Sequence, residues 1–188
     1  MKKLIALVFA STVAAAASAA PETYVMDPLH TFSRFEYSHF GYSTQVNKFN
    51  STQGKIQIDR SAHTGSVEVT IDPKSVNTGS ELFNGHLQGP DFFDSEKYPA
   101  ITYKSTRFNF KGDSLASVDG QLTIKGVTRP VTLEVTSFHC MPHPMMKKDA
   151  CGANAVAKIK RSEFGAGKYA PHVSDEVVLG FSIEAVKE

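Results

Sequence analysis

Apolar and polar residues alternate along most of the chain with the two-residue period of β-strands. In Ser66–Ile71, valine and isoleucine alternate with serine, glutamate and threonine, and Val131–Ser137 repeats the pattern. Val177–Ala185 continues it over five apolar positions. Because successive side chains of a strand point to opposite faces, this period predicts half-buried strands. The eight strand candidates are Thr31–Phe40, Gly54–Asp59, Ser66–Ile71, Ile101–Phe110, Ser117–Lys125, Val131–Ser137, Asn154–Lys160 and Val177–Ala185.

Turn-forming residues separate these candidates. Lys111–Asp113 and Lys125–Val127 each place a glycine between two strand candidates, as tight turns require. Neither a proline-rich linker nor a block of like charge divides the chain, and its 188 residues suit a single domain. Eight antiparallel strands without an internal repeat predict an all-β sandwich or a closed barrel.

One segment breaks the β pattern. Thr78–Glu81 has the form of a capping box, and Phe83 and Leu87 stand four residues apart. A Gly-Pro pair follows and stops a helix. The segment therefore predicts a short helix over Ser80–Gln88, followed by the acidic and aromatic step Asp91–Asp94. We expect such an inserted helix to lie across an opening of the barrel or against its outer face.

The first residues have the pattern of a secretory signal peptide. A basic Met1–Lys3 precedes the apolar stretch Leu4–Ala17, and Ala17–Ala19 supplies small residues for cleavage. We expect cleavage after Ala19, which leaves residues 20–188 as the exported protein. An N-terminal membrane anchor is the alternative, but the stretch is too short to span a bilayer. Because no other apolar stretch reaches about 18 residues, the mature protein is not expected to be membrane-embedded.

The charge balance argues against nucleic acid as the main partner. The chain has 20 Lys and Arg against 19 Asp and Glu, and removing residues 1–19 takes away two lysines. Nucleic acids and anionic membranes call for a basic excess on the protein. Among the aromatic residues, 13 Phe and 6 Tyr stand beside no Trp. Phenylalanine supplies large apolar area without a polar atom that needs a partner, which suits a core or a ligand cavity.

The two cysteines, Cys140 and Cys151, close a loop of 12 residues. In an exported protein a lone pair of cysteines predicts a disulfide bond. A reactive thiol pair is the alternative, but the separation differs from the C-x-x-C spacing of redox motifs.

The sequence contains no recognisable catalytic motif, and we expect that the protein is not an enzyme. A nucleophile elbow, a glycine-rich phosphate loop and an H-E-x-x-H metalloprotease motif are all missing from it. Two close carboxylate pairs, Asp91 with Asp94 and Asp175 with Glu176, flank aromatic or strand segments. Helix capping and solvated strand ends explain these pairs without acid–base chemistry.

The segment His139–Met146 offers an alternative function, copper binding. Histidine, methionine and thiolate are soft ligands that suit copper, which an exported protein can meet. The competing interpretation is a disulfide-closed loop with incidental side chains, because a bridged Cys140 is not a thiolate ligand. The candidate copper ligands are His139, Met141, His143, Met145 and Met146. A zinc site is not expected, since no ligand spacing occurs among His30, His39, His86 and His172.

Large apolar side chains collect on one strand face and around the predicted helix. Phe35, Tyr37 and His39 share one face of the strand candidate Thr31–Phe40. The helix and the neighbouring loops add Phe49, Leu82, Leu87, Phe92 and Phe93. These residues fit a filled core, and they equally fit the wall of a cavity, because barrels of about eight strands can hold one ligand.

Four segments carry a more specific signal. They are Asp27–Thr31 with Phe35–Gly41, His86–Asp94 with Tyr98–Pro99, Gly120–Val131, and Ile159–Gly165. In this order they resemble the opening, the helix with its acidic-aromatic motif, the hairpin and the late turn of the YceI-like family. The resemblance covers essentially all of residues 20–188.

The resemblance implies an extended, lipocalin-like antiparallel barrel of eight strands with one short helix, exported to the bacterial periplasm and often a homodimer. It implies carriage or sequestration of an isoprenoid lipid, a polyprenyl chain or an isoprenoid quinone, in a tunnel through the barrel. A lipid isomerase or hydrolase is the enzymatic alternative. The ligand-binding candidates carried over are Phe35, Tyr37, His39, His86, Leu87, Phe92 and Phe93. Leu122, Ile124, Arg161 and Phe164 follow, which also fit a role in closing the fold.

The chain departs from this family in two places. Relatives commonly have Arg-Asp shortly before the His-Leu pair, where this chain has Phe83 and Asn84. Without that charge, a neutral head group such as a quinone ring is favoured over a charged one. The loop between Cys140 and Cys151 is absent from many relatives, and the sequence leaves open whether it lies at the cavity mouth or braces two strands.

Overall fold

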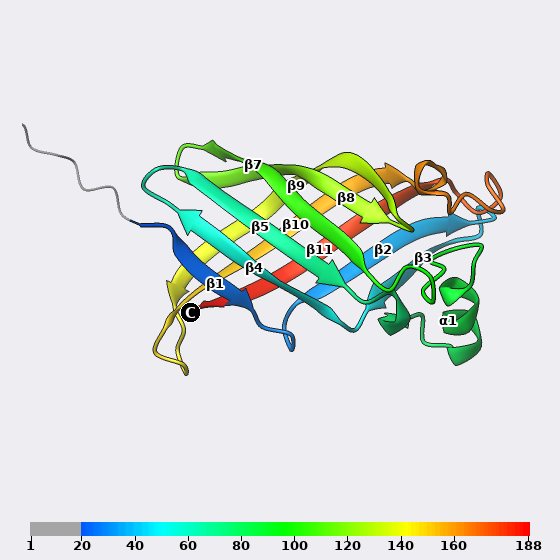
Figure 1. Cartoon of the computed structure of the whole chain (residues 1–188), viewed down its shortest axis with the longest axis horizontal. Coiled ribbons are helices and arrows are strands. Elements are labelled where there is room, and N and C mark those ends of the chain that lie inside the picture. Colours follow the sequence, from blue (N-terminus) through cyan, green and yellow to red (C-terminus); the bar gives the residue numbers. More distant parts are fainter. Residues whose placement is uncertain (1–19) are drawn as a thin grey trace, which may run out of the picture.

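The computed structural model describes residues 20–188, which form one antiparallel sheet and one short α-helix (Figure 1). The predicted signal peptide, residues 1–19, lies outside the described residues. Among residues 20–188, no helix is long and apolar enough to cross a membrane. The strands are β1 Glu22–Met26, β2 Phe32–His39, β3 Ser43–Phe49, β4 Thr52–Asp59, β5 Thr64–Ile71, β6 Val76–Asn77, β7 Ile101–Lys111, β8 Ser114–Ile124, β9 Val127–Pro142, β10 Asp149–Lys160 and β11 Glu176–Lys187. The helices are α1 Glu81–Gln88 and the 3-10 turns η1 Pro73–Ser75 and η2 Arg161–Phe164.

Eight of the strands close into a ring, which confirms the predicted barrel. Their order is β1, β4, β5, β7, β8, β9, β10 and β11, and β11 returns to pair with β1. β2 also pairs with β11, nearer the start of that strand, and carries β3 and β6 beside it. In Figure 1 the barrel lies lengthwise, with α1 at one end and the C-terminus at the other. The helix, the β2–β3 turn and the segment after η2 therefore gather at one end.

The predicted strands correspond to β2, β4, β5 and β7 to β11, whereas the sequence pattern does not predict β1, β3 and β6. The sequence pattern does not predict β3 because its inward positions include the polar Gln45 and Asn47, while the apolar Val46 faces outward. β1 and β6 have five and two residues, too few to show a period. The helix begins one residue later than predicted, because Ser80 is its N-cap and its Oγ accepts a hydrogen bond from the Phe83 N–H at 3.4 Å.

Large side chains pack over glycines inside the barrel. Tyr103 lies over Gly120, where a Cβ atom would come within 2.4 Å of the tyrosine ring. Phe108 lies over Gly65, where a Cβ atom would come within 2.6 Å of the phenylalanine ring. The Tyr103 hydroxyl donates to the Val118 carbonyl at 2.8 Å, so the buried phenol has a partner. These glycines make room for a close-packed interior.

The predicted disulfide is confirmed, and it lies away from the helix. Cys140 on β9 and Cys151 on β10 occupy directly opposite positions of the ladder and are bonded to each other. The loop they flank, residues 143–148, projects from the barrel end opposite α1 (Figure 1). The bond therefore braces the β9–β10 hairpin at that end.

The close packing over Gly120 makes it intolerant of a side chain. In Gly120→Ala the new Cβ would lie 2.4 Å from the Tyr103 ring and 2.7 Å from the Lys104 carbonyl oxygen, so strands must shift. We predict a loss of about 1–3 kcal/mol in the free energy of unfolding, measured by urea denaturation. Gly85→Ala is the matched control, because Gly85 lies in α1 with open space around its Cβ position. That control should gain about 0.5–1 kcal/mol, and equal midpoints for the two variants would refute this packing argument.

Candidate functional site

The half of the barrel that is next to α1 contains a cavity of about 300 Å³. This volume is at the lower end of the range for small-molecule sites in proteins, about 300–1,000 Å³. Its wall comes from the inward positions of the sheet, from α1 and the loop after it, and from the segment after η2. The cavity belongs to the α1 half of the barrel, and its wall includes neither Tyr103 nor Phe108. The tunnel through the whole barrel that the family resemblance implies remains a prediction.

Three phenylalanine rings from separate segments meet at the cavity wall. Phe35 of β2, Phe49 of β3 and Phe93 of the loop after α1 have centroid distances of 5.3–5.7 Å. Phe93 meets the other two rings edge to face, the geometry that aromatic pairs prefer. A tight turn holds Phe93 in place, since its N–H donates to the Leu87 carbonyl at 3.0 Å. The loop after α1 thereby inserts its aromatic side chain against the β2–β3 pair.

Two segments cover the cavity, the loop after α1 (residues 89–100) and the segment after η2 (residues 165–175). Polar contacts join them to each other. The Lys125 ammonium donates to the Pro90 carbonyl at 2.8 Å and to the Gly165 carbonyl at 2.9 Å. Lys168 forms a salt bridge with Asp91. The loop after α1 and the segment after η2 are therefore joined across the end of the barrel.

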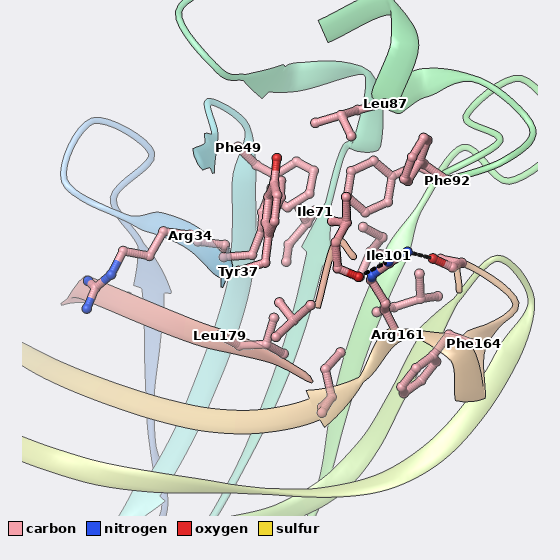
Figure 2. A pocket seen from close by; sticks show the side chains of 18 of the residues that line it. Arg34, Tyr37, Phe49, Ile71, Leu87, Phe92, Ile101, Arg161, Phe164 and Leu179 are labelled. Atoms are coloured by element: carbon pink, nitrogen blue, oxygen red, sulfur yellow. Dashed lines mark hydrogen bonds between the residues drawn. The ribbon is translucent and has the colours of Figure 1, made fainter. Parts of the chain in front are cut away.

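Arg161 holds the segment after η2, residues 165–175, in its conformation by hydrogen bonds. Its guanidinium donates to four backbone carbonyls, and burial lowers the pKa of this arginine. Figure 2 shows the guanidinium turned toward two of these acceptors beside the cavity. Four of its five N–H donors are used in this way, so Arg161 holds the chain fold around the cavity. The acceptors are the carbonyls of Ala166, Lys168, Val173 and Ser174.

No aspartate, glutamate or lysine lines the cavity in the described residues. The other lining cation, Arg34, pairs with Glu36 at 3.3 Å and points away from the other side chains in Figure 2. An ionic ligand buried here would therefore lack a free partner of opposite charge, which makes its burial costly. The wall suits an uncharged, apolar molecule.

Twelve of the thirteen side chains predicted to bind ligand line this cavity. The exception is Leu82, which is 89% exposed on α1, whereas Leu87 on the same helix is 4% exposed and faces the cavity. Contact of the twelve with a ligand remains a prediction. They are Phe35, Tyr37, His39, Phe49, His86, Leu87, Phe92, Phe93, Leu122, Ile124, Arg161 and Phe164.

Sequence reasoning missed roughly as many lining residues as it found. Val177, Leu179 and Phe181 belong to the alternating stretch of β11, whose inward face could have been included. The segment after η2 has no period, so Ala166, Tyr169 and Val173 carried no signal. The remaining lining residues are Ser33, Arg34, Phe40, Ile71, Phe83, Ile101 and Ile159.

The segment proposed as a copper site is arranged as a structural loop. Cys140 is bonded to Cys151, so it offers no thiolate. The His143 Nδ1 atom accepts hydrogen bonds from the N–H groups of Met145 and Met146 at 3.2 and 3.1 Å. Among residues 20–188, no three His, Cys, Asp or Glu side chains are grouped as metal ligands. These contacts favour the interpretation of a disulfide-closed loop.

Comparisons with known proteins agree with this architecture. A family model described as the YceI-like domain matches residues 24–185. Protein YceI of Escherichia coli O157:H7 is 36% identical over 190 residues, covering 100% of this chain and 98% of its own. BcnA of Burkholderia cenocepacia has a TM-score of 0.73 at 26% identity, over 85% of this chain and 98% of that chain. A structure described as a polyisoprenoid binding domain from Saccharophagus degradans, implicated in plant cell wall breakdown, has a TM-score of 0.66 at 18% identity over 88% of this chain and 98% of that one, which shows a shared fold.

Removing the guanidinium of Arg161 should loosen the segment after η2. In Arg161→Met the side chain keeps its length but leaves four carbonyls without their donor. We predict faster hydrogen exchange in residues 165–174 and a loss of about 1–3 kcal/mol in the free energy of unfolding. Arg129→Met is the control, because the exposed Arg129 makes one bond of 3.4 Å to its neighbour Thr128. Unchanged exchange in residues 165–174 of Arg161→Met would contradict the assigned role.

Proposed function

This chain belongs to the YceI-like family, and from that membership we propose that it is a non-enzymatic binding protein for an isoprenoid lipid. The ligand is a polyprenyl chain or an isoprenoid quinone, held in the cavity below α1. The observation that carries the proposal is the cavity itself. Its wall is built from aromatic and aliphatic side chains, and its two lining cations are already paired with other groups of the protein.

Burial of the isoprenoid chain supplies the binding energy in this proposal. One five-carbon unit gives roughly 3–4 kcal/mol, at about 0.8 kcal/mol for each buried CH₂ group. Association and ordering cost on the order of 4–15 kcal/mol, so several units must be buried for tight binding. An apolar wall without a competing ionic group fits this requirement, because the affinity then comes from the chain.

The Saccharophagus degradans domain suggests which class of lipid to test as a ligand of this protein. That protein is described as polyisoprenoid binding, but at 18% identity the likeness establishes the shared fold alone. It therefore directs which lipids are tested first, and the proposal for this chain stands on the chemistry of its cavity.

An aspartate inside the cavity should prevent lipid uptake. In Phe93→Asp the carboxylate replaces a ring packed between Phe35 and Phe49, and burying it beside an apolar chain is costly. We predict that native mass spectrometry finds bound lipid on the wild-type protein, or finds uptake when ubiquinone or polyprenol is offered, and finds none on the variant. Leu82→Asp is the control, because Leu82 is exposed on α1 outside the cavity.

Two results would overturn this proposal. A wild-type protein that carries no lipid and takes up neither ubiquinone nor polyprenol is not an isoprenoid carrier. A ligand that is recovered chemically altered after incubation would make the protein an enzyme. Circular dichroism of both aspartate variants separates loss of binding from loss of the barrel.

We also propose that the protein acts in the periplasm of its bacterium, after cleavage of residues 1–19. Support comes from the basic, apolar and small-residue pattern of that segment and from the disulfide, which persists in oxidising compartments. We predict that the protein recovered from a periplasmic fraction begins at Ala20 and contains no free thiol. A cytoplasmic protein that retains Met1–Ala19 would contradict the proposal.

A further inference from the structure

The β3 strand holds one buried polar side chain that has no hydrogen-bond partner. Asn47 is 4% exposed, and its Nδ2 is the one buried side-chain nitrogen or oxygen in residues 20–188 without a hydrogen-bond partner. An unpaired buried donor costs about 1–3 kcal/mol. Such a group in a native fold calls for an explanation, and support of a neighbouring functional side chain is one.

Asn47 lies next to the hydroxyl group of Tyr37. In the β2–β3 ladder Tyr37 is opposite Gln45 and Phe35 is opposite Asn47, so Asn47 and Tyr37 are diagonal neighbours on one face. Burial raises the pKa of Tyr37, and the neighbouring Asn47 side chain acts in the opposite direction. A phenol oxygen can accept from an amide N–H while its own proton is donated elsewhere, so the two side chains can act together.

Tyr37 differs from the other buried tyrosines in lacking an acceptor. Tyr24 donates to Glu22 at 2.7 Å, and Tyr103 donates to the Val118 carbonyl at 2.8 Å. Tyr37 is 8% exposed and lines the cavity, and its hydroxyl makes no such bond within residues 20–188. Figure 2 shows its ring among the side chains that surround the cavity.

The neighbouring polar groups of the wall already have partners or lie nearer the solvent. The Ser33 Oγ accepts from Thr52 at 3.1 Å, and Arg161 is bonded to backbone carbonyls. His39 is half-buried and His86 is exposed. The Tyr37 hydroxyl is thus a donor without an acceptor that the cavity wall offers to a ligand.

We infer that Tyr37, supported by Asn47, forms a head-group subsite that donates one hydrogen bond to an uncharged carbonyl oxygen of the ligand, as in a quinone ring. The inference rests on the proposed function and adds the part of the ligand that is recognised. In the complex the Asn47 amide donates to the Tyr37 oxygen, and the Tyr37 hydroxyl donates to the carbonyl. A hydrocarbon would leave the Tyr37 hydroxyl without an acceptor, and an anion would find no free cation.

Binding of two ligands with matched tails tests this subsite. A ubiquinone and an isoprenoid hydrocarbon with the same number of isoprene units are titrated by calorimetry against wild type, Tyr37→Phe and Asn47→Leu. Tyr37→Phe should weaken ubiquinone binding roughly tenfold and leave hydrocarbon binding unchanged. Asn47→Leu should weaken ubiquinone binding less, because Tyr37 remains but is no longer oriented. Tyr42→Phe is the control, because Tyr42 is 90% exposed in the β2–β3 turn.

Infrared spectroscopy gives a second readout that does not depend on variant stability. The carbonyl stretch of ubiquinone bound to the wild type should lie below its position in an apolar solvent, and this shift should disappear in Tyr37→Phe. Hydrocarbon and ubiquinone binding that respond equally to Tyr37→Phe, or an unshifted carbonyl band in the wild type, would overturn the subsite while the lipid-binding function stands. If the wild type binds neither ligand, the proposed function fails, and the subsite fails with it.

Discussion

The width of an eight-stranded barrel is the constraint on which the rest of the molecule depends. Such a ring encloses a space that side chains can just fill, or that can hold one ligand. In this protein, side chains fill one part of the barrel, and another part contains a cavity. Where the interior is filled, Gly65 and Gly120 make room for Phe108 and Tyr103. Below α1, aromatic rings stand along the wall and leave about 300 Å³ unfilled. The distribution of a few glycines and aromatic side chains thus determines where the barrel has space for a ligand.

An apolar cavity also needs a cover whose own polar groups are satisfied. The loop after α1 and the segment after η2 have no sheet partners for much of their backbone, and a buried, unpaired carbonyl is costly. Lys125 and Arg161 meet that need by donating to six backbone carbonyls between them. The cations at this end are therefore used in the structure of the cover. That use explains how a chain with nearly balanced charge encloses a site without a free ionic group.

Periodic parts of the chain allow prediction, and aperiodic parts do not. The alternation in β2 predicts that Phe35 and Tyr37 share one inward face, and the four-residue spacing of Phe83 and Leu87 indicates a helix. Leu82 shows the limit, because a helix of eight residues does not reveal from sequence which of its leucines turns inward. The segment after η2 lies at the cavity through the contacts of Arg161, which join positions up to 13 residues apart. Such contacts leave no trace in local pattern.

One residue, Asn47, explains both why the sequence pattern does not predict β3 and why one buried polar group has no partner. β3 escapes recognition because Asn47 occupies an inward position where the alternation of a filled barrel calls for an apolar residue. A leucine there would complete the pattern and remove the unpaired amide. Sequences that break a local rule at a cost in stability tend to do so at functional sites. Asn47 fits that description, since it is a diagonal neighbour of Tyr37, the one buried tyrosine of the described chain that lacks an acceptor. The failure of the pattern at β3 therefore points to the neighbour of a tyrosine that lines the cavity.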